Sequence, residues 1–263
     1  PRGIVAAAVS AVFAFKLIAH GYPQAKELVP MTFFVIIGTV AIYGLTAPWL
    51  ASALNIATPN PQGIVFVGAH SWSRQIAKVL HDEGIKVMMI DTNFDNVSAA
   101  RLDGIEAFNK SALSPSEVEE LEMDGLGRLL AMTPNNEVNA LAAVRFSSTL
   151  GESNVYQLPP DSKKNGKKGE DTKKGPDHLK GRYLFKADTT YTYLNKLFRG
   201  DVEIKKTKLS KEFDYKTFQA RYTVIPLFLI TQAKEVQIFT AENPPTPKTD
   251  QTLISLSHKE SSS

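Results

Sequence analysis

Residues 64–91 read IVFVGAHSWSRQIAKVLHDEGIKVMMID, and this stretch decides how the larger part of the chain folds. Residues 64–67 are all apolar and predict a short buried strand. A helical pattern follows at residues 74–83, and residues 86–90 predict a second strand that ends at Asp91. The order of strand, turn, helix, strand and acid is typical of a Rossmann-type βαβ unit, in which the acid reaches a ribose hydroxyl.

The glycine fingerprint of such units is incomplete here. Gly68 keeps the first glycine position, but His70 and Ser73 stand at the second and third. The second glycine lets the backbone approach a pyrophosphate, so His70 places a side chain where the phosphates would lie. Ser73 is small and still permits the helix to pack on the strand. Two interpretations stay open: the domain binds NAD(H) or another adenine nucleotide, or the fold persists without one. His70 could bond a phosphate or cap the helix, and Ser71 or Ser73 could equally cap it.

The alternation of strands and helices continues along the chain. Helices are predicted at residues 94–102, 114–121 and 138–150, and strands at 104–108, 127–132 and 154–158. This alternation predicts an α/β Rossmann-like, doubly wound parallel sheet, which we assign to residues 63–160. Ligands on such sheets bind beyond the carboxyl ends of the strands. The candidate cofactor-binding residues are therefore the polar and glycine residues of those turns: Gly68, His70, Asp91, Asn93 and Thr133. Each of them is also explained, individually, as a turn-forming residue.

The N-terminal part of the chain is depleted of charge. Residues 1–57 carry four charged side chains, against 53 in the other 206 residues. Residues 3–19 form an apolar run that, as a helix, is roughly 25 Å long, and residues 29–54 are uncharged and long enough to span a bilayer. With the polar turn at residues 20–27, they predict a membrane α-helical hairpin in contact with the lipid bilayer. A signal peptide and buried core helices of a soluble protein are the alternatives.

The composition excludes several classes of site. The 263 residues include no cysteine, so a disulfide framework, a thiolate zinc site and a cysteine nucleophile are all excluded. A net charge of +3, without a basic patch interleaved with aromatic residues, argues against a nucleic-acid partner. No catalytic constellation and no metal site is visible in the sequence, so we do not expect an enzyme. Because the chain begins Pro-Arg-Gly, we expect a processed product or the C-terminal piece of a longer protein.

The C-terminal part changes character twice. Residues 161–180 contain the run DSKKNGKKGEDTKKG and predict a flexible Lys-rich linker, with contact to anionic lipid as the alternative. Residues 181–257 predict a small, mostly β domain in which Pro226 suits an edge or a bulge. Residues 258–263 predict a disordered tail. Within the β domain we expect one short helix and four strands: residues 191–198 for the helix, and 201–209, 223–230, 235–241 and 252–257 for the strands.

Two stretches resemble a known arrangement. Arg2-Gly3 and Gly44-Leu45-Thr46 resemble the motifs that begin one late helix and end the final helix of bacterial CPA1-type monovalent cation:proton antiporters. Residues 68–158 resemble the TrkA-N (RCK-type) domain of potassium transport systems, with Asn136-Glu-Val-Asn139 entering the last helix as is typical of it. Some antiporters carry such a domain at the C-terminus. The chain is therefore similar to the C-terminal part of such an antiporter.

The resemblance implies exchange of Na⁺ or K⁺ against protons by a multi-pass, homodimeric protein of the bacterial plasma (inner) membrane, regulated by a cytoplasmic C-terminal domain. Arg2 matches a family position that pairs with a carboxylate inside the bundle. The family's ion-binding Asp lies on an earlier helix, so upstream antiporter helices would complete the transport site. Two other functions remain. One is a gating subunit or domain of a potassium channel or uptake system. The other is a membrane-anchored NAD-dependent oxidoreductase, which needs an intact glycine loop and a catalytic acid.

Overall fold

The computed structural model describes residues 3–54, 61–161, 181–200, 202–221 and 224–258. Predictions for Arg2, for most of the Lys-rich linker and for the tail from residue 259 therefore lie outside the described residues. The chain forms two compact units, Pro1–Pro59 and Asn60–Ser263, and each is taken by itself below.

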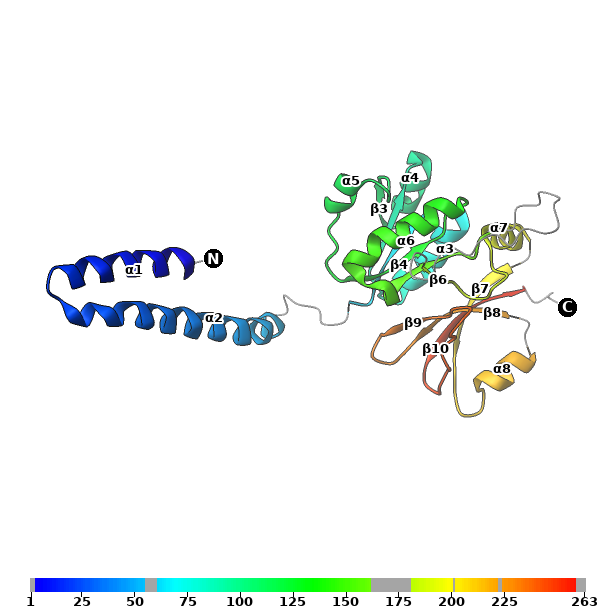
Figure 1. Cartoon of the computed structure of the whole chain (residues 1–263). Helices are drawn as coiled ribbons and strands as arrows, with labels where there is room; N and C mark the ends of the chain where they lie inside the picture. Colours follow the sequence, from blue (N-terminus) through cyan, green and yellow to red (C-terminus); the bar gives the residue numbers. More distant parts are fainter. Residues whose placement is uncertain (1–2, 55–60, 162–180, 201, 222–223, 259–263) are drawn as a thin grey trace, which may run out of the picture. The chain divides into compact units, whose positions relative to one another are not determined.

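The first unit is a helical hairpin, drawn in blue in Figure 1. Helix α1 (Gly3–Ala19) and helix α2 (Leu28–Ala53) are joined by the short 3₁₀ helix η1 (Pro23–Glu27). Small residues line their contact, because a side chain at Gly3 would lie 3.1 Å from Ile36 and the Ser10 and Thr32 hydroxyls are 2.8 Å apart. The predicted helical hairpin is confirmed as a fold.

The surface of this hairpin is apolar. Phe34 and Leu45 are each 80% exposed, as are many other large apolar side chains of both helices. Thr39 and Thr46 turn their hydroxyls inward, since each donates to the backbone carbonyl four residues back. One helical stretch, Pro23–Ala51, is long and apolar enough to cross a bilayer, while Gly3–Ala19 is shorter. Membrane insertion of the hairpin itself stays a prediction.

The second unit begins with a six-stranded parallel sheet in the order β3-β2-β1-β4-β5-β6. The predicted alternation of strands and helices along the chain is confirmed. The order of strands in the sheet reverses between β1 and β4, so the topological switch point lies between these two strands. The elements, with the 3₁₀ turn η2 between α6 and β5, run β1 Gly63–Val67, α3 Ser71–Asp82, β2 Val87–Asp91, α4 Phe94–Leu102, β3 Glu106–Asn109, α5 Pro115–Glu119, β4 Leu126–Ala131, α6 Asn136–Leu150, η2 Glu152–Asn154, β5 Val155–Gln157 and β6 Arg182–Tyr183.

Helices cover both faces of this sheet, which confirms the doubly wound architecture (Figure 1). Phe66 of β1 faces the side on which α3 and α4 pack, together with Ile76 of α3. Val65 faces the opposite side, where Phe146 of α6 packs. Alternate residues of a strand point to opposite faces of the sheet. A strand buried on both faces therefore has apolar residues at every position, as in the continuous apolar run seen in the sequence.

The sixth strand was not predicted. Arg182 and Tyr183 pair in parallel with Tyr156 and Gln157 of β5, so the chain returns to the parallel sheet before the β-rich part begins. The Gly181 amide donates to Gln157 Oε1 at 3.0 Å and holds this return. A two-residue strand has no periodicity of its own, so no local pattern predicts it.

The rest of the second unit is an antiparallel sheet in the order β7-β10-β8-β9. Its elements are α7 Tyr191–Arg199, β7 Val202–Lys208, α8 Tyr215–Arg221, β8 Val224–Ile230, β9 Val236–Ile238 and β10 Thr252–His258. The four strands and helix α7 were predicted, whereas α8 was not. Pro226 lies opposite Ser255, next to a shift of register after Ile254, and β8 lies between β10 and β9. Of the two predicted settings for this proline, an edge or a bulge, the register shift fits the bulge.

The two sheets share one hydrophobic core. Leu227 and Ile254 of the antiparallel sheet belong to the same buried cluster as Ile85 and α3. Polar contacts add to it, because Lys206 Nζ lies 2.8 Å from Glu83 Oε1 and the Val236 amide donates to Gln62 Oε1 at 2.8 Å. The antiparallel sheet is therefore fixed against the α3 side of the parallel sheet.

Candidate functional site

The turns after β1, β2 and β4 meet at the switch point of the parallel sheet. Three of the predicted site residues, Gly68, Asp91 and Thr133, line one cavity of about 140 Å³ there. Lys110 and Ser111, which the sequence did not single out, also line it. His70 and Asn93 do not. The structure thus brings three of five predicted residues together at the place where ligands of doubly wound folds bind.

Gly68 permits a close approach of strands β1 and β4. Its φ is +105°, a conformation that L side chains rarely adopt, and an added Cβ would lie 3.2 Å from the Met132 carbonyl oxygen. The Gly68 amide donates to the Ile90 carbonyl at 2.8 Å. The first glycine of the fingerprint is therefore required by the backbone itself, whether or not a ligand binds.

Asp91 lines the cavity and also bonds the glycine loop, residues 68–73. Its Oδ2 accepts from the Ala69 amide at 2.7 Å and from Asn96 Nδ2 at 3.0 Å, and its Oδ1 accepts from the Asn93 amide at 2.8 Å. A carboxylate offers about four acceptor positions, and three are used here. The ribose contact expected of Asp91 would have to compete with these three bonds.

The His70 side chain does not line the cavity. It occupies the N-cap position of α3, but its ring makes no capping bond. Its Nε2 lies 2.7 Å from the Met132 carbonyl oxygen, so Nε2 must carry the proton and donate. The ring also packs 4.2 Å from the Trp72 ring and 5.1 Å from the Tyr191 ring, between centroids. The suggested capping role of His70 is therefore wrong, and a phosphate contact of its Nε2 would have to replace the bond to Met132.

Burial lowers the pKa of His70 below its usual value of 6.5, while its bond to Met132 and the charge of Asp91 act in the opposite direction. Its Nδ1 is buried, and among the described residues it has no hydrogen-bond partner. The neutral ring is therefore the form that this environment favours.

A dependence of stability on pH follows from this lowered pKa. The unfolded chain binds a proton at His70 more readily than the folded chain, so the contribution of His70 to stability is complete above pH 6.5 and is lost as the pH falls toward the folded pKa. We expect the melting temperature of the wild-type chain to fall more between pH 7.5 and 5.5 than that of His70→Gln. Equal falls in the two melting curves would contradict this.

The side chains of Ser73 and Arg74 donate hydrogen bonds to backbone carbonyls of the glycine loop. The Ser73 hydroxyl lies 2.8 Å from the carbonyl oxygens of both Gly68 and His70, and is fully buried. Arg74 Nη1 donates to the Ala69 carbonyl at 2.9 Å. Ser73 thus permits the packing expected of a small residue and adds a hydrogen bond that glycine lacks.

Asn93 and Thr133 are used as turn residues. The Asn93 side chain caps α4 by accepting from the Asp95 and Asn96 amides. Thr133 bonds Asn139, whose Oδ1 accepts from the Thr133 amide at 2.9 Å and from its hydroxyl at 2.8 Å. Asn139 Nδ2 donates back to the Thr133 carbonyl at 2.9 Å. The sequence pointed to Asn139 only as part of the Asn136–Asn139 motif. The feature that marks its structural role, the burial of its side chain in α6, was missed.

These contacts decide how the site fits a dinucleotide. The loop amide of Ala69 already bonds Asp91, and His70 places a side chain at the second glycine position. The residues present therefore do not fit a pyrophosphate on this loop in the conformation described. Within the described ranges, no group of three or more His, Cys, Asp or Glu side chains is arranged to hold a metal ion. What the arrangement provides is a rigid junction of three strand ends.

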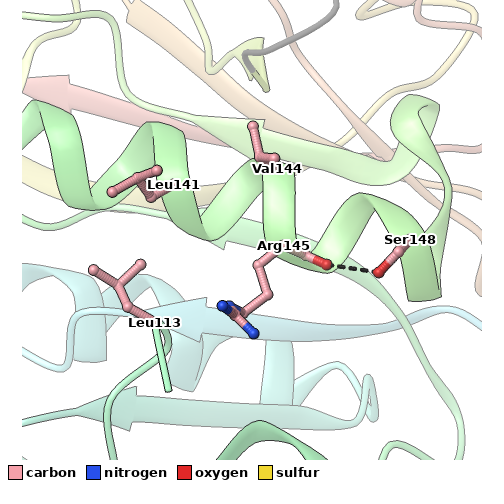
Figure 2. A pocket seen from close by; sticks show the side chains of 5 residues that line it. All are labelled: Leu113, Leu141, Val144, Arg145 and Ser148. Atoms are coloured by element: carbon pink, nitrogen blue, oxygen red, sulfur yellow. Dashed lines mark hydrogen bonds between the residues drawn. The ribbon is translucent and has the colours of Figure 1, made fainter. Parts of the chain in front are cut away.

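A second hollow lies on the outer side of α6 (Figure 2). It has a volume of about 420 Å³ and is open to solvent, and Leu141, 56% exposed, lies across from Leu113 in it. The dashed line marks the bond from the Ser148 hydroxyl to the Arg145 carbonyl at 2.8 Å. None of the predicted site residues lines this hollow.

Comparison with known proteins supports the sequence assignment of this region. Residues 64–158 match the family model of the TrkA-N domain, and the parallel sheet from β1 to β5 fits that fold. The chain thus contains a TrkA-N domain. Comparison with curated protein sequences gave no match.

Solved structures with a similar fold include two separate domains and a channel. The NAD(P)-binding domain of an exopolyphosphatase-related protein from Archaeoglobus fulgidus is 15% identical, with 40% of this chain and 77% of that chain covered and a TM-score of 0.34. The TrkA-N domain of the inner membrane protein YbaL from Escherichia coli is 14% identical, with coverages of 38% and 75% and a TM-score of 0.34. The GsuK channel bound to NAD is 11% identical, with coverages of 91% and 47% and a TM-score of 0.36.

Proposed function

We propose that this chain is the C-terminal part of a monovalent cation:proton antiporter, in which the TrkA-N domain acts as an RCK-type regulator on the cytoplasmic side. The observation that carries the proposal is the combination of an apolar helical hairpin and a TrkA-N domain in one chain. A soluble enzyme has no need of a hairpin whose large apolar side chains are exposed along both helices.

The hairpin contributes structure rather than an ion site. Among its described residues, Glu27 is the one carboxylate, and it lies in the turn η1. We therefore place the carboxylate that binds Na⁺ or K⁺ and protons on other helices. These helices, together with the lipid bilayer, would surround α1 and α2. Arg2 would pair with a carboxylate of that bundle in the inner membrane of a bacterium, and the whole would work as a homodimer.

The role of the TrkA-N domain is regulatory in this proposal. Asp91, His70 and Thr133 bond the chain's own backbone or its side chains, which favours a regulatory over a catalytic role for them. NAD(H) or another adenine nucleotide stays a prediction for the regulator. The contacts of the glycine loop count against a pyrophosphate there, whereas the GsuK channel is described as bound to NAD.

The test is ion exchange by the full-length protein in proteoliposomes, followed with a pH-sensitive dye after a pulse of Na⁺ or K⁺. We expect proton movement driven by the cation. We also expect that removing residues 60–263 changes the dependence of the rate on pH or on cation concentration by about twofold or more, roughly 0.4 kcal/mol of coupling. A full-length protein carrying Lys216→Gln, an exposed change on α8, serves as the control.

Two results would contradict the proposal. A K⁺ current without proton movement would favour the gating domain of a potassium channel. Cation-independent oxidation of NADH would favour the oxidoreductase.

A further inference from the structure

The open hollow on the outer side of α6, about 420 Å³ in volume, combines apolar walls with one positive charge (Figure 2). Its lining residues are Leu113, Leu141, Val144, Arg145 and Ser148. The last four belong to α6 and are spaced as i, i+3, i+4 and i+7, so they form one stripe along the helix. We propose that this hollow binds a small aliphatic carboxylic acid, with the carboxylate on the guanidinium group and the hydrocarbon body on the leucine and valine side chains.

The walls suit a hydrocarbon body. Leu141 and Val144 are both exposed, and Leu113 lies across from Leu141, partly buried against the core beneath. Single exposed apolar side chains are common on protein surfaces, but here three of them line one concave place. Its volume lies within the range of small-molecule sites, which are mostly apolar with a few polar groups. A short aliphatic chain bound there removes apolar surface from water.

Arg145 provides the charge of the hollow. Its side chain is half-buried and extends from α6 on the side where Leu113 lies (Figure 2). Within the part of the chain that the structure describes, its guanidinium group makes no ion pair and no hydrogen bond. No carboxylate is among the described residues that line the hollow. A guanidinium group presents its N–H donors in a planar fork that matches a carboxylate, and such charge-assisted bonds are the strong ones.

Two acids in the segment that follows Leu113 have other partners. Glu117 Oε2 accepts from the Ser111 amide at 2.6 Å. Glu120 Oε2 lies 2.5 Å from Lys110 Nζ. A carboxylate from outside the chain would therefore not have to displace either of them to reach Arg145.

The walls are ordered before a ligand enters. The Leu113 amide donates to the Ser111 hydroxyl at 3.3 Å, which fixes the turn before α5. Helix α6 is capped by Asn135, and its inner side is anchored in the core by Phe146. A site held in this way loses little conformational freedom on binding, and such preorganisation favours affinity.

The hollow adjoins the cavity at the switch point. Leu113 lines both, whereas the other four lining residues belong to the hollow alone. An acid bound in the hollow would therefore contact one wall of the switch-point cavity without occupying the glycine loop.

The test is methyl NMR of the full chain in lipid nanodiscs, with leucine and valine methyl groups labelled. The probes are 4-methylpentanoate, its neutral amide 4-methylpentanamide, and acetate. We expect 4-methylpentanoate to shift the methyl signals of Leu113, Leu141 and Val144, with half-saturation at about 5 mM or less. The amide should bind about threefold or more weakly, as one ion pair in a partly exposed site predicts. Acetate, which has the charge without the hydrocarbon body, should also bind about threefold or more weakly.

The variants separate the charge from the apolar wall. Arg145→Gln should remove the preference for the acid, and Arg145→Lys should keep part of it, because lysine has the charge without the planar fork. Leu141→Glu places a carboxylate four residues before Arg145, where the two pair along the helix. It should weaken binding of the acid about threefold or more relative to Leu141→Gln, which has the same size without the charge. Arg199→Gln is the matched control, an exposed arginine of α7 outside the hollow, and should change nothing.

Three outcomes would overturn the proposal, provided that the methyl spectra show folded variants. One is no shift of these methyl signals by 4-methylpentanoate at concentrations up to about 20 mM. The second is equal binding of acid and amide, or a preference for the acid that survives in Arg145→Gln. The third is methyl signals that depend on protein concentration and not on the acid, which would show that a second copy of the chain covers the hollow. None of these outcomes bears on cation exchange, so the proposed transport function is tested separately.

Discussion

Replacing Asn139 by leucine is expected to lower the free energy of unfolding of the second unit by about 2–4 kcal/mol. Asn139 is 1% exposed, and its amide group makes three hydrogen bonds to Thr133. Leucine has a similar size and fills the space, but it leaves the Thr133 amide, carbonyl and hydroxyl without this partner. Each buried polar group left unpaired costs about 1–3 kcal/mol, less where water reaches it.

Chemical denaturation of the full chain, followed by circular dichroism, measures this loss. The matched control is Asn195→Leu in helix α7, a half-buried asparagine whose side chain makes no hydrogen bond within the part of the chain that the structure describes. The control should change stability by less than about 0.5 kcal/mol. If the two variants unfold at the same denaturant concentration, the Thr133–Asn139 contact does not stabilise the fold as inferred.

The second large effect is expected at the glycine loop. His70→Gly should create or strengthen NADH binding by about tenfold or more, equivalent to roughly 1.4 kcal/mol. The substitution restores the glycine that lets a pyrophosphate approach the backbone, and it removes the ring bonded to the Met132 carbonyl. The acid at the end of β2 is already in place, since Asp91 lies beside the same loop.

Titration of NADH against the wild-type and variant chains measures this gain, with melting curves as a check on folding. Ser71→Gly is the control, because Ser71 is exposed at the first turn of α3 and leaves His70 in place. Tight NADH binding by the wild-type chain would show that His70 moves aside without substitution. Equal, weak binding by wild type and His70→Gly would show that the loop contacts of Asp91 exclude the dinucleotide by themselves.

Much of the fold could be predicted from the sequence because its signals are local. Residues 64–67 are continuously apolar, as a strand buried on both faces must be, and the helix that follows has a clear apolar side at Ile76 and Leu80. The structure adds one more turn at the N-terminus of that helix, since α3 begins at Ser71. The same local patterns predicted the two helices of the hairpin.

The missed elements have weak or short signals. Helix α8 is seven residues long. Its local sequence signal is Asp214 just before its start, whose Oδ1 accepts from the Thr217 amide at 2.8 Å. The backbone bond to Thr217 also lowers the pKa of Asp214. Strand β6 depends on pairing with a segment that lies earlier in the chain, which no local pattern reveals.

Three of the five predicted residues line the cavity at the switch point, but the contacts that they make were not predicted. The positions of Gly68, Asp91 and Thr133 at strand ends follow from the alternation of elements. Their partners follow from tertiary structure: Asp91 bonds Ala69 across 22 positions, and His70 bonds Met132 across 62. A sequence pattern predicts which residues lie at the switch point. Only the folded structure shows which hydrogen bonds these residues already make within the chain.

The packing of Trp72 against His70 gives the chain a native optical label. The sequence holds two tryptophans, and they differ in environment, since Trp72 is 3% exposed and Trp49 is 72% exposed. The indole of Trp72 lies 4.2 Å from the imidazole and 5.8 Å from the Phe198 ring. In a Trp49→Phe background, the emission of Trp72 therefore reports on the glycine loop and on helix α7 together. Movement of either can be followed in real time without an attached dye.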